Sequence, residues 1–481
     1  MRRLRLVQTK LNRFMTKWYY PAAVGVFGLL CHVLGWEYFF FTVIVLAVVY
    51  ICVFNRNSLR LIPLLFVSLV SLSRVNNTYI YIRSFDSFIR NTGGLIYIIL
   101  LSVTFLSATG YLFIYKLVKE KSARDSLKNS KLIVGLLALT VVCFTGGLFS
   151  PSYTLTSVVI AAALASAVIV TFVFFLGTVE WDKDSFNFVC DCATVMIAVI
   201  AIQMGLLYLT DSVFRGLISR DPRAAKGMIW LGWAPSNLIA ITIAIVLPLV
   251  LYRMCTAKYP LIYFAVAFAA VVAMIYTFCR NTAVFALPMF LAVSIYALVK
   301  AKEKKTLRIA YAVTAGLGGI LILIFLPQIT GSLNFFESRG LGDSGRFELY
   351  RKAVDHFRAW PVFGVGFGHL TGGAERIGVS LYHNHILQIL ASMGIAGLAV
   401  YGFHRFQTVR LLVKKRDKEN MFIFIGIGMV VLTALLDNTL FNPMMLILYA
   451  VLLVMLEKNT GLLNRPFAKY KERAAECRPY T

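Results

Sequence analysis

Two histidines stand in one short segment, Tyr382-His383-Asn384-His385, where the chain enters a long apolar run. Imidazole titrates near neutral pH, so a well-placed histidine can accept a proton from a hydroxyl group and act as a general base. Two other interpretations stay open: a hydrogen-bonded structural histidine, and a zinc site formed by His383 and His385. No third ligand of suitable spacing lies nearby, which argues against zinc.

Arg280 is the second residue whose type and place indicate chemistry. It interrupts an apolar stretch of about forty residues, and a charged side chain inside such a stretch marks a functional site by default. The planar guanidinium suits a phosphate, since its donors match two oxygens at once. The alternative is an arginine in an interfacial turn whose head group reaches water.

An amphipathic helix is predicted over residues 345–360, with Asp343 or Ser344 as its cap and Pro361 just beyond its end. Its apolar face consists of Phe347, Tyr350, Val354 and Phe357, and its charged face of Arg351, Lys352, Asp355 and Arg358. Such a helix suits the outer membrane surface or, alternatively, solvent. Gly364, Gly366 and Gly368 follow it. No strand precedes them, which excludes a dinucleotide loop, so we expect them to allow tight backbone re-entry beside a substrate.

The elements that carry these residues are predicted to be membrane helices. The chain of 481 residues is 59% hydrophobic, 15% charged and has a mean hydropathy of +0.76, far from the composition of soluble domains. Its net charge of +26 is spread in clusters between apolar runs, which excludes a nucleic-acid-binding face. The eight cysteines form no disulfide or metal pattern, and Cys190 and Cys192, which flank Asp191, are interpreted as helix-core thiols.

Fourteen apolar runs are long enough to be helices that cross a bilayer. They lie near 19–36, 37–54, 59–74, 94–115, 132–150, 154–177, 188–210, 229–252, 259–279, 283–299, 309–327, 384–403, 421–437 and 439–456. The basic N-terminal segment indicates that both termini are cytoplasmic, although the acidic segment 178–187 departs from the positive-inside rule. We therefore expect one multi-pass domain over 1–481, with a long extracytoplasmic loop at 328–382.

Several motifs together resemble the O-antigen ligase and polymerase family. They are Ser344-Gly345-Arg346, the glycine series from Pro361 to Gly368, and His383-Asn384 followed after nine residues by Gly394 and then Gly397. Pro235-Ser236-Asn237 resembles an asparagine-containing helix of the family. Thr277-Phe278-Cys279-Arg280 resembles its serine–arginine signature, although Cys279 replaces the serine and puts a hydroxyl role there in doubt.

The resemblance implies a membrane-embedded, GT-C-like glycosyltransferase that is inverting and needs neither metal nor cofactor. Its partners would be an undecaprenyl-pyrophosphate-linked oligosaccharide donor, a glycan acceptor and the lipid bilayer, with a chain-length regulator in addition. By position, His383 would activate the acceptor hydroxyl, while Arg280 and Arg346 would hold the pyrophosphate. The implied substrate-binding residues are Asn237, Arg339, Arg351, Asn384 and His385, with Arg358 and Arg376 as further arginine candidates.

Three activities remain open. A polymerase would extend lipid-linked repeat units on the outer face of the cytoplasmic membrane, and about fourteen helices favour it over a ligase, for which about twelve are expected. A ligase would move the finished glycan to a separate acceptor. A flippase for lipid-linked oligosaccharides would belong to another class, but no internal repeat supports it.

Overall fold

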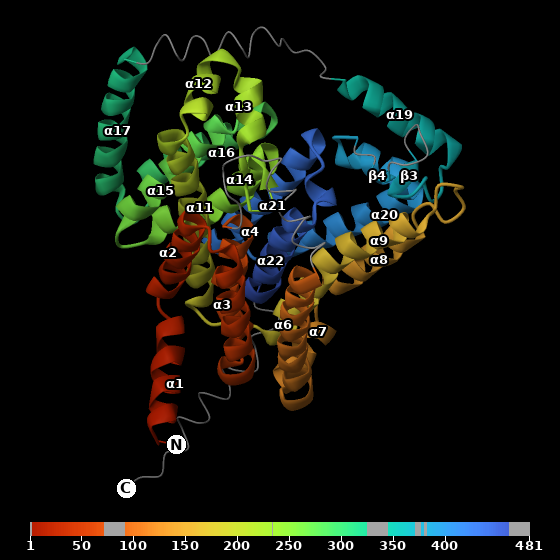
Figure 1. Ribbon diagram of the computed structural model, residues 1–481, viewed down its shortest axis with the longest axis horizontal. Helices are drawn as coiled ribbons and strands as arrows, with labels where there is room; N and C mark the ends of the chain where they lie inside the picture. The colour runs from red at the N-terminus through yellow and green to blue at the C-terminus, as the bar shows by residue number, and fades with distance from the viewer. Residues whose placement is uncertain are drawn as a thin grey trace. The chain divides into compact units, whose positions relative to one another are not determined.

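The computed structural model describes residues 2–71, 92–232, 234–324, 345–370, 377–379 and 382–460. In this part of the chain nearly all elements are helices (Figure 1), with two antiparallel pairs of short strands. The chain divides into two compact units, Met1–Leu112 with Lys183–Ser344, and Phe113–Asp182 with Gly345–Thr481. The helical prediction is confirmed, while one domain over the whole chain and a GT-C-like architecture stay predictions.

The first unit is organised around α14 (Ser236–Thr256). This helix is apolar at most positions and is almost entirely buried, because α11 (Ser185–Thr210), α15 (Pro260–Tyr276) and α16 (Arg280–Lys300) pack around it. The other elements of the unit are α1 (Arg2–Met15), α2 (Tyr19–Leu34), α3 (Glu37–Tyr50), α4 (Ile62–Val70), most of α6 (Thr92–Lys119), α12 (Ser212–Arg220), α13 (Pro222–Met228), the β1–β2 pair (Trp230–Leu231 and Ala234–Pro235) and α17 (Lys304–Ile324).

The second unit is organised around α22 (Pro443–Asn459), which packs against α10 (Thr171–Thr178) and α21 (Lys418–Leu436). A π-helical turn at Ser166–Val170 joins α10 to α9 (Leu155–Ala165) in one continuous apolar span. The remaining elements are α7 (Lys121–Lys128), α8 (Ile133–Thr145), α19 (Arg346–Ala359), the β3–β4 pair (Gly368–Leu370 and Ile377–Val379), α20 (His385–Lys414) and a 3₁₀ turn at Thr439–Phe441.

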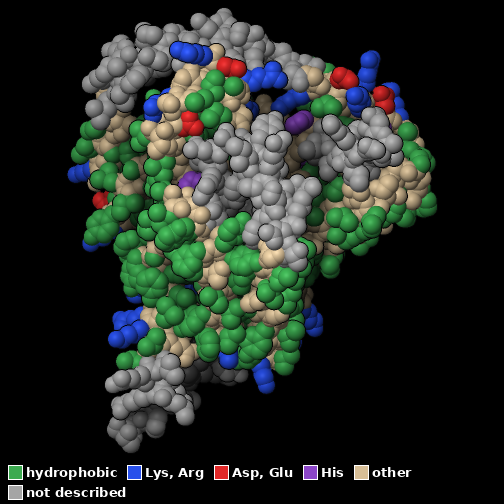
Figure 2. Space-filling view, in the orientation of Figure 1, with side chains coloured by type: hydrophobic (Ala, Val, Ile, Leu, Met, Phe, Trp, Pro, Cys, Tyr) green, Lys and Arg blue, Asp and Glu red, His purple; other side chains and the backbone are tan. Residues whose placement is uncertain are grey.

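Each of the fourteen predicted runs contains a helix, but not every one is a full span. In the described ranges eight helices are long and apolar enough to cross a membrane, or nine if α7 and α8, bent by 66°, count as one. The run predicted from 229 begins instead as the β1–β2 pair, because Gly232 adopts a left-handed conformation with φ 58° and turns the chain. Apolar side chains also cover much of the described surface (Figure 2), as expected of lipid-facing helices. The protein is a multi-pass membrane protein.

Candidate active site

The predicted base His383 lies next to a carboxylate that the sequence analysis did not identify. His383 directly precedes the cap of α20, and Asp437 directly follows α21. The distance from His383 Nδ1 to Asp437 Oδ1 is 3.1 Å, and the two side chains are 35% and 11% exposed. An ionised carboxylate only accepts hydrogen bonds, so Nδ1 carries the proton and Nε2 is left with its lone pair. The pair therefore has the arrangement of a general base with an orienting carboxylate.

The Asp437 carboxyl is held in its charged form. Burial acts to raise its pKa, but the hydrogen bonds from His383 and from the backbone N–H of Asn438, together with the positive charges of Arg346 and of the His383 ring in its protonated form, outweigh burial, so its pKa lies below the ordinary range. Arg346, which the sequence predicts to bind the pyrophosphate, is the first residue of α19, and its charge acts on the Asp437 carboxylate. The second unit therefore places His383 and Asp437 in contact, and the charge of Arg346 acts on Asp437.

The backbone of His383 is itself constrained. Its φ of 51° lies in the left-handed region, which costs a non-glycine residue about 1–2 kcal/mol. The neighbouring side chains hold this conformation. Asn384 accepts hydrogen bonds from the N–H groups of Ile386 and Leu387 at 3.0 and 3.1 Å, and donates to the Leu435 carbonyl at 3.1 Å. The predicted substrate-binding residue Asn384 thus caps α20 and ties it to the end of α21.

The other predicted histidine has a separate environment. His385 is 1% exposed, and its Nε2 lies 2.9 Å from the hydroxyl of Tyr401, one α20 side chain against another. His383 instead contacts Asp437, so the two histidines have separate hydrogen-bond partners.

Helix α20 is broken at Gly394, where its backbone bonds to the segment after α19. Gly394 has φ 64° and ψ −159°, which interrupts the helical hydrogen bonds. The N–H groups of Ile395 and Ala396 donate instead to the carbonyls of Pro361 and Val362, at 2.8 and 3.2 Å. A Cβ at residue 394 would collide with the Val362 carbonyl, so only glycine fits.

The glycine series after α19 makes the reciprocal contacts. The N–H groups of Val365 and Gly366 donate to the carbonyls of Ala391 and Ser392, at 2.8 and 3.1 Å. Gly364 has φ 68°, and a Cβ there would collide with the Ser392 backbone. Gly364 and Gly366 therefore allow the tight backbone approach that their spacing predicts, against the backbone of α20, and a substrate beside them stays a prediction. We call this contact between residues 361–366 and 391–396 the glycine lock.

Helix α19 packs on α20 through a side next to the predicted apolar face, and the place of that apolar face on the membrane stays a prediction. It buries Ala353 against Tyr382 and Ala391, with Leu349 at the edge, while Phe347 remains 70% exposed. The small side chain of alanine lets the helices approach closely, which hydrophobicity alone does not predict.

The ends of α19 agree only in part with the sequence prediction. The helix ends at Ala359, before Pro361, as predicted, and it starts after Gly345. The predicted caps Asp343 and Ser344 lie outside the described residues, as do Arg339 and Arg376. Among the other arginine candidates, Arg351 is exposed.

The remaining predicted residues lie in the first unit. Arg280 is the first residue of α16, after Phe278, whose φ of 53° turns the chain sharply. The ammonium group of Lys226, on α13, lies 3.5 Å from the Phe278 carbonyl and so adds a second cation near this turn. Cys279, at the position of the family's serine, contacts the Thr282 hydroxyl at 3.3 Å. Asn237 is the second residue of α14.

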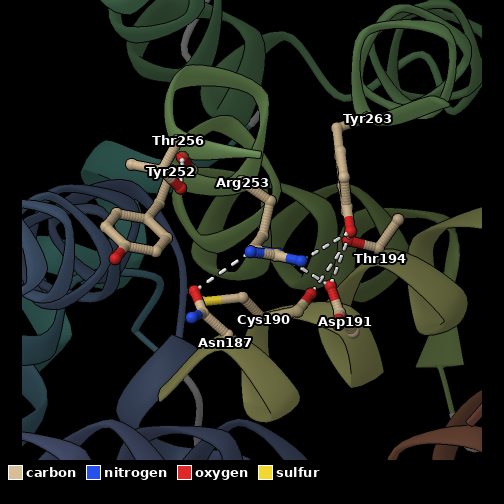
Figure 3. A network of polar contacts seen from close by, with 8 residues as sticks. All are labelled: Asn187, Cys190, Asp191, Thr194, Tyr252, Arg253, Thr256 and Tyr263. Atoms are coloured by element: carbon tan, nitrogen blue, oxygen red, sulfur yellow. Dashed lines mark hydrogen bonds and ion pairs between the residues drawn. The ribbon is translucent and has the colours of Figure 1, made fainter. Parts of the chain in front are cut away.

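Asp191, which lies between Cys190 and Cys192, holds three helices of the first unit together. Arg253 donates from Nε to Asp191 at 2.8 Å and from its terminal nitrogens to Asn187 and Tyr263 at 3.1 and 3.0 Å (Figure 3). Tyr263 donates in turn to Asp191 at 2.8 Å. The network joins α11, α14 and α15. Because the charge of Asp191 is balanced by Arg253 within the protein, Asp191 has a structural role.

A small cavity in the second unit is too small for a glycan. It has a volume of about 70 Å³, with mostly apolar walls that include Leu136 and Met393. Ligand pockets usually measure some 300–1,000 Å³. The guanidinium of Arg405 at its wall donates to the Tyr449 hydroxyl at 2.8 Å and lies over the Tyr401 ring at 4.8 Å. The cavity therefore does not compete with His383 as the substrate site.

Comparison with known families locates the same region. A protein-family model described as O-antigen ligase matches residues 264–402. A search of curated proteins found no match to the chain. The match contains Arg280, Arg346 and His383, and Asp437 lies beyond it. Residues 264–402 are thus an O-antigen ligase family domain.

Proposed function

We propose that the protein is a membrane glycosyltransferase that polymerises lipid-linked polysaccharide repeat units. It would transfer glycan from undecaprenyl pyrophosphate to an acceptor hydroxyl on the outer face of the cytoplasmic membrane. The observation that carries this proposal is the contact between His383 and Asp437 beside Arg346, within or next to the family domain. Both termini would be cytoplasmic, and a chain-length regulator would be a further partner.

In this reaction His383 acts on the acceptor. Nε2 takes the proton from the acceptor hydroxyl as its oxygen attacks the anomeric carbon of the donor sugar. The imidazolium that forms is stabilised by the Asp437 carboxylate, which keeps Nδ1–H in place. One displacement of this kind inverts the anomeric configuration, and the general base contributes a factor of about 10²–10⁴ in rate.

The arginines act on the leaving group. The bond from the anomeric carbon to the pyrophosphate oxygen breaks, and negative charge grows on the pyrophosphate. Fixed guanidinium groups stabilise that charge without reorganisation, which is the role proposed for Arg280 and Arg346. The donor is already activated, so the proposed reaction needs no metal or cofactor.

The proposal is tested with purified protein in nanodiscs and a lipid-linked repeat unit as the only substrate. We expect the wild type to produce longer glycans on the lipid. We expect His383→Ala to retain its melting temperature and to leave the single repeat unextended. Arg346→Ala should also slow extension, because it removes a charge proposed to stabilise the leaving pyrophosphate. Lys352→Ala is its control: it removes a positive charge from the same helix at an exposed residue that pairs with Glu348, and it should keep the wild-type rate. A fully active His383→Ala protein would disprove the proposal.

A ligase is the second candidate, because the matching family model is described as O-antigen ligase. The same experiment separates the two activities. A protein that forms no product from repeat units alone, but transfers glycan once a separate acceptor glycolipid is added, is a ligase.

A further inference from the structure

The first turns of α19 carry an aromatic pair that the packing of this helix does not bury. Phe347 is 70% exposed and Tyr350 is half-buried, and their ring centroids lie 6.1 Å apart with the planes at 81°. The side of α19 that packs on α20 instead carries Leu349 and Ala353. Two adjacent aromatic rings therefore line the exposed side of the helix next to its packed face.

The position of the pair is defined by Arg346. Residues four apart on a helix lie one above the other, so Tyr350 follows Arg346 along the same side of α19. The charge of Arg346 acts on Asp437, which contacts His383. The aromatic pair therefore begins at the residue after Arg346, and Ala353 on the same helix packs against Tyr382, the residue before His383.

Sugar rings are ligands that match such a pair. One face of a pyranose presents C–H groups with small positive charges, and the face of an aromatic ring is negative, so the two stack. The Tyr350 hydroxyl can in addition exchange hydrogen bonds with sugar hydroxyl groups.

On the basis of the proposed function, we infer that Phe347 and Tyr350 form the binding platform for a sugar ring of the acceptor glycan. The donor carries a pyrophosphate, which the proposed cationic side chains hold. The acceptor presents a sugar hydroxyl to His383, so its orientation depends on contacts with the sugar ring beside that base. The platform supplies them on the same unit as His383, and it selects acceptors whose terminal sugar exposes an apolar face.

The competing role for the two rings is insertion into the membrane interface, where aromatic residues are common. Leucine substitutions separate the two roles. Leucine keeps the apolar area that would enter lipid, but it lacks a flat aromatic face. Tyr350→Phe keeps the ring and removes only the hydroxyl.

The test measures transfer in nanodiscs from a lipid-linked repeat unit whose own acceptor hydroxyl is blocked to a short glycan of the same repeat that carries no lipid, so that the concentrations of acceptor and donor can be varied separately. We expect Phe347→Leu and Tyr350→Leu each to raise the acceptor KM about tenfold, with little change in kcat or in the donor KM. Tyr350→Phe should recover most of the loss. Phe357→Leu is the matched control, because Phe357 lies seven residues after Tyr350, about 10 Å further along the helix.

The outcomes are distinct. An unchanged acceptor KM in both leucine variants, or a rise in the donor KM instead, overturns the platform while leaving the proposed function intact. A wild-type protein that transfers no sugar overturns both. Melting temperatures of the variants should match the wild type, since both rings lie outside the packed face of α19.

Discussion

Asp437→Asn is the substitution that examines the proposed base most directly. Asparagine has the same shape as aspartate, but its amide nitrogen can donate to Nδ1 of His383 and so favour the tautomer with the proton on Nε2. That tautomer cannot accept a proton from the acceptor. A hydrogen bond to a charged group is worth about 1.5–3 kcal/mol, and each 1.36 kcal/mol is a factor of ten in rate. We therefore expect kcat to fall about 10- to 150-fold, with little change in KM.

The assay is extension of lipid-linked repeat units by purified protein, with products separated by length. Asp417→Asn is the matched control, because Asp417 caps the opposite end of the same helix and asparagine caps a helix as well as aspartate does. An Asp437→Asn protein with the wild-type rate would refute the reasoning. So would a loss of rate that is matched by the Asp417→Asn control.

The pH dependence of stability follows from the lowered pKa of Asp437. A carboxyl whose pKa is lower in the folded state adds stability that is fully present above its unfolded pKa of about 4. That stability is lost as the pH falls through the lower, folded value. The difference in melting temperature between wild type and Asp437→Asn should therefore be constant near neutral pH and shrink below about pH 4. A constant difference down to the lowest pH would contradict the assignment.

Three further substitutions test the scaffold, with melting temperature and rate as readouts. Gly394→Ala should lower the melting temperature and the rate, because the added Cβ collides with a backbone carbonyl of the glycine lock. The control is Gly402→Ala in the same helix. It should be neutral or slightly stabilising, since no atom lies within 4 Å of the added Cβ. Asp191→Asn should cost about 3 kcal/mol by leaving Arg253 without its carboxylate, and the double variant with Arg253→Met should recover part of it. Asn384→Ala should cost about 1 kcal/mol of stability through the lost helix cap, and it should also lower kcat because Asn384 holds the backbone next to His383. Asn384→Asp should retain the cap.

The helices could be predicted from the sequence, and His383 could be singled out as the proposed base, because their signals are local. An apolar run forms a helix wherever the backbone has no water to bind, and each of the fourteen runs contains one. His383 stands in a motif of fixed spacing. Asp437 could not be found in this way, because its partner lies 54 residues away and only the fold brings them together. Its one local signal was an acidic residue at the very end of an apolar run.

The orientation of α19 shows a second limit of sequence analysis. The hydrophobic pattern predicts an apolar face that contains Phe347, but it does not predict the side that packs on α20, where close approach of the two helices favours the small Ala353. The purpose of the glycines was equally hidden. Their spacing indicated backbone contact, yet whether that contact is with a ligand or with another segment depends on the tertiary structure.

The glycine lock has a consequence for how such proteins can diversify. It anchors the chain at residues 361–366 to a membrane helix, only a few turns from the base. Apart from the glycines, these backbone contacts do not depend on which side chains surround them. Side chains elsewhere in the second unit can therefore differ between related proteins while His383 keeps its position at the junction of α20 and α21.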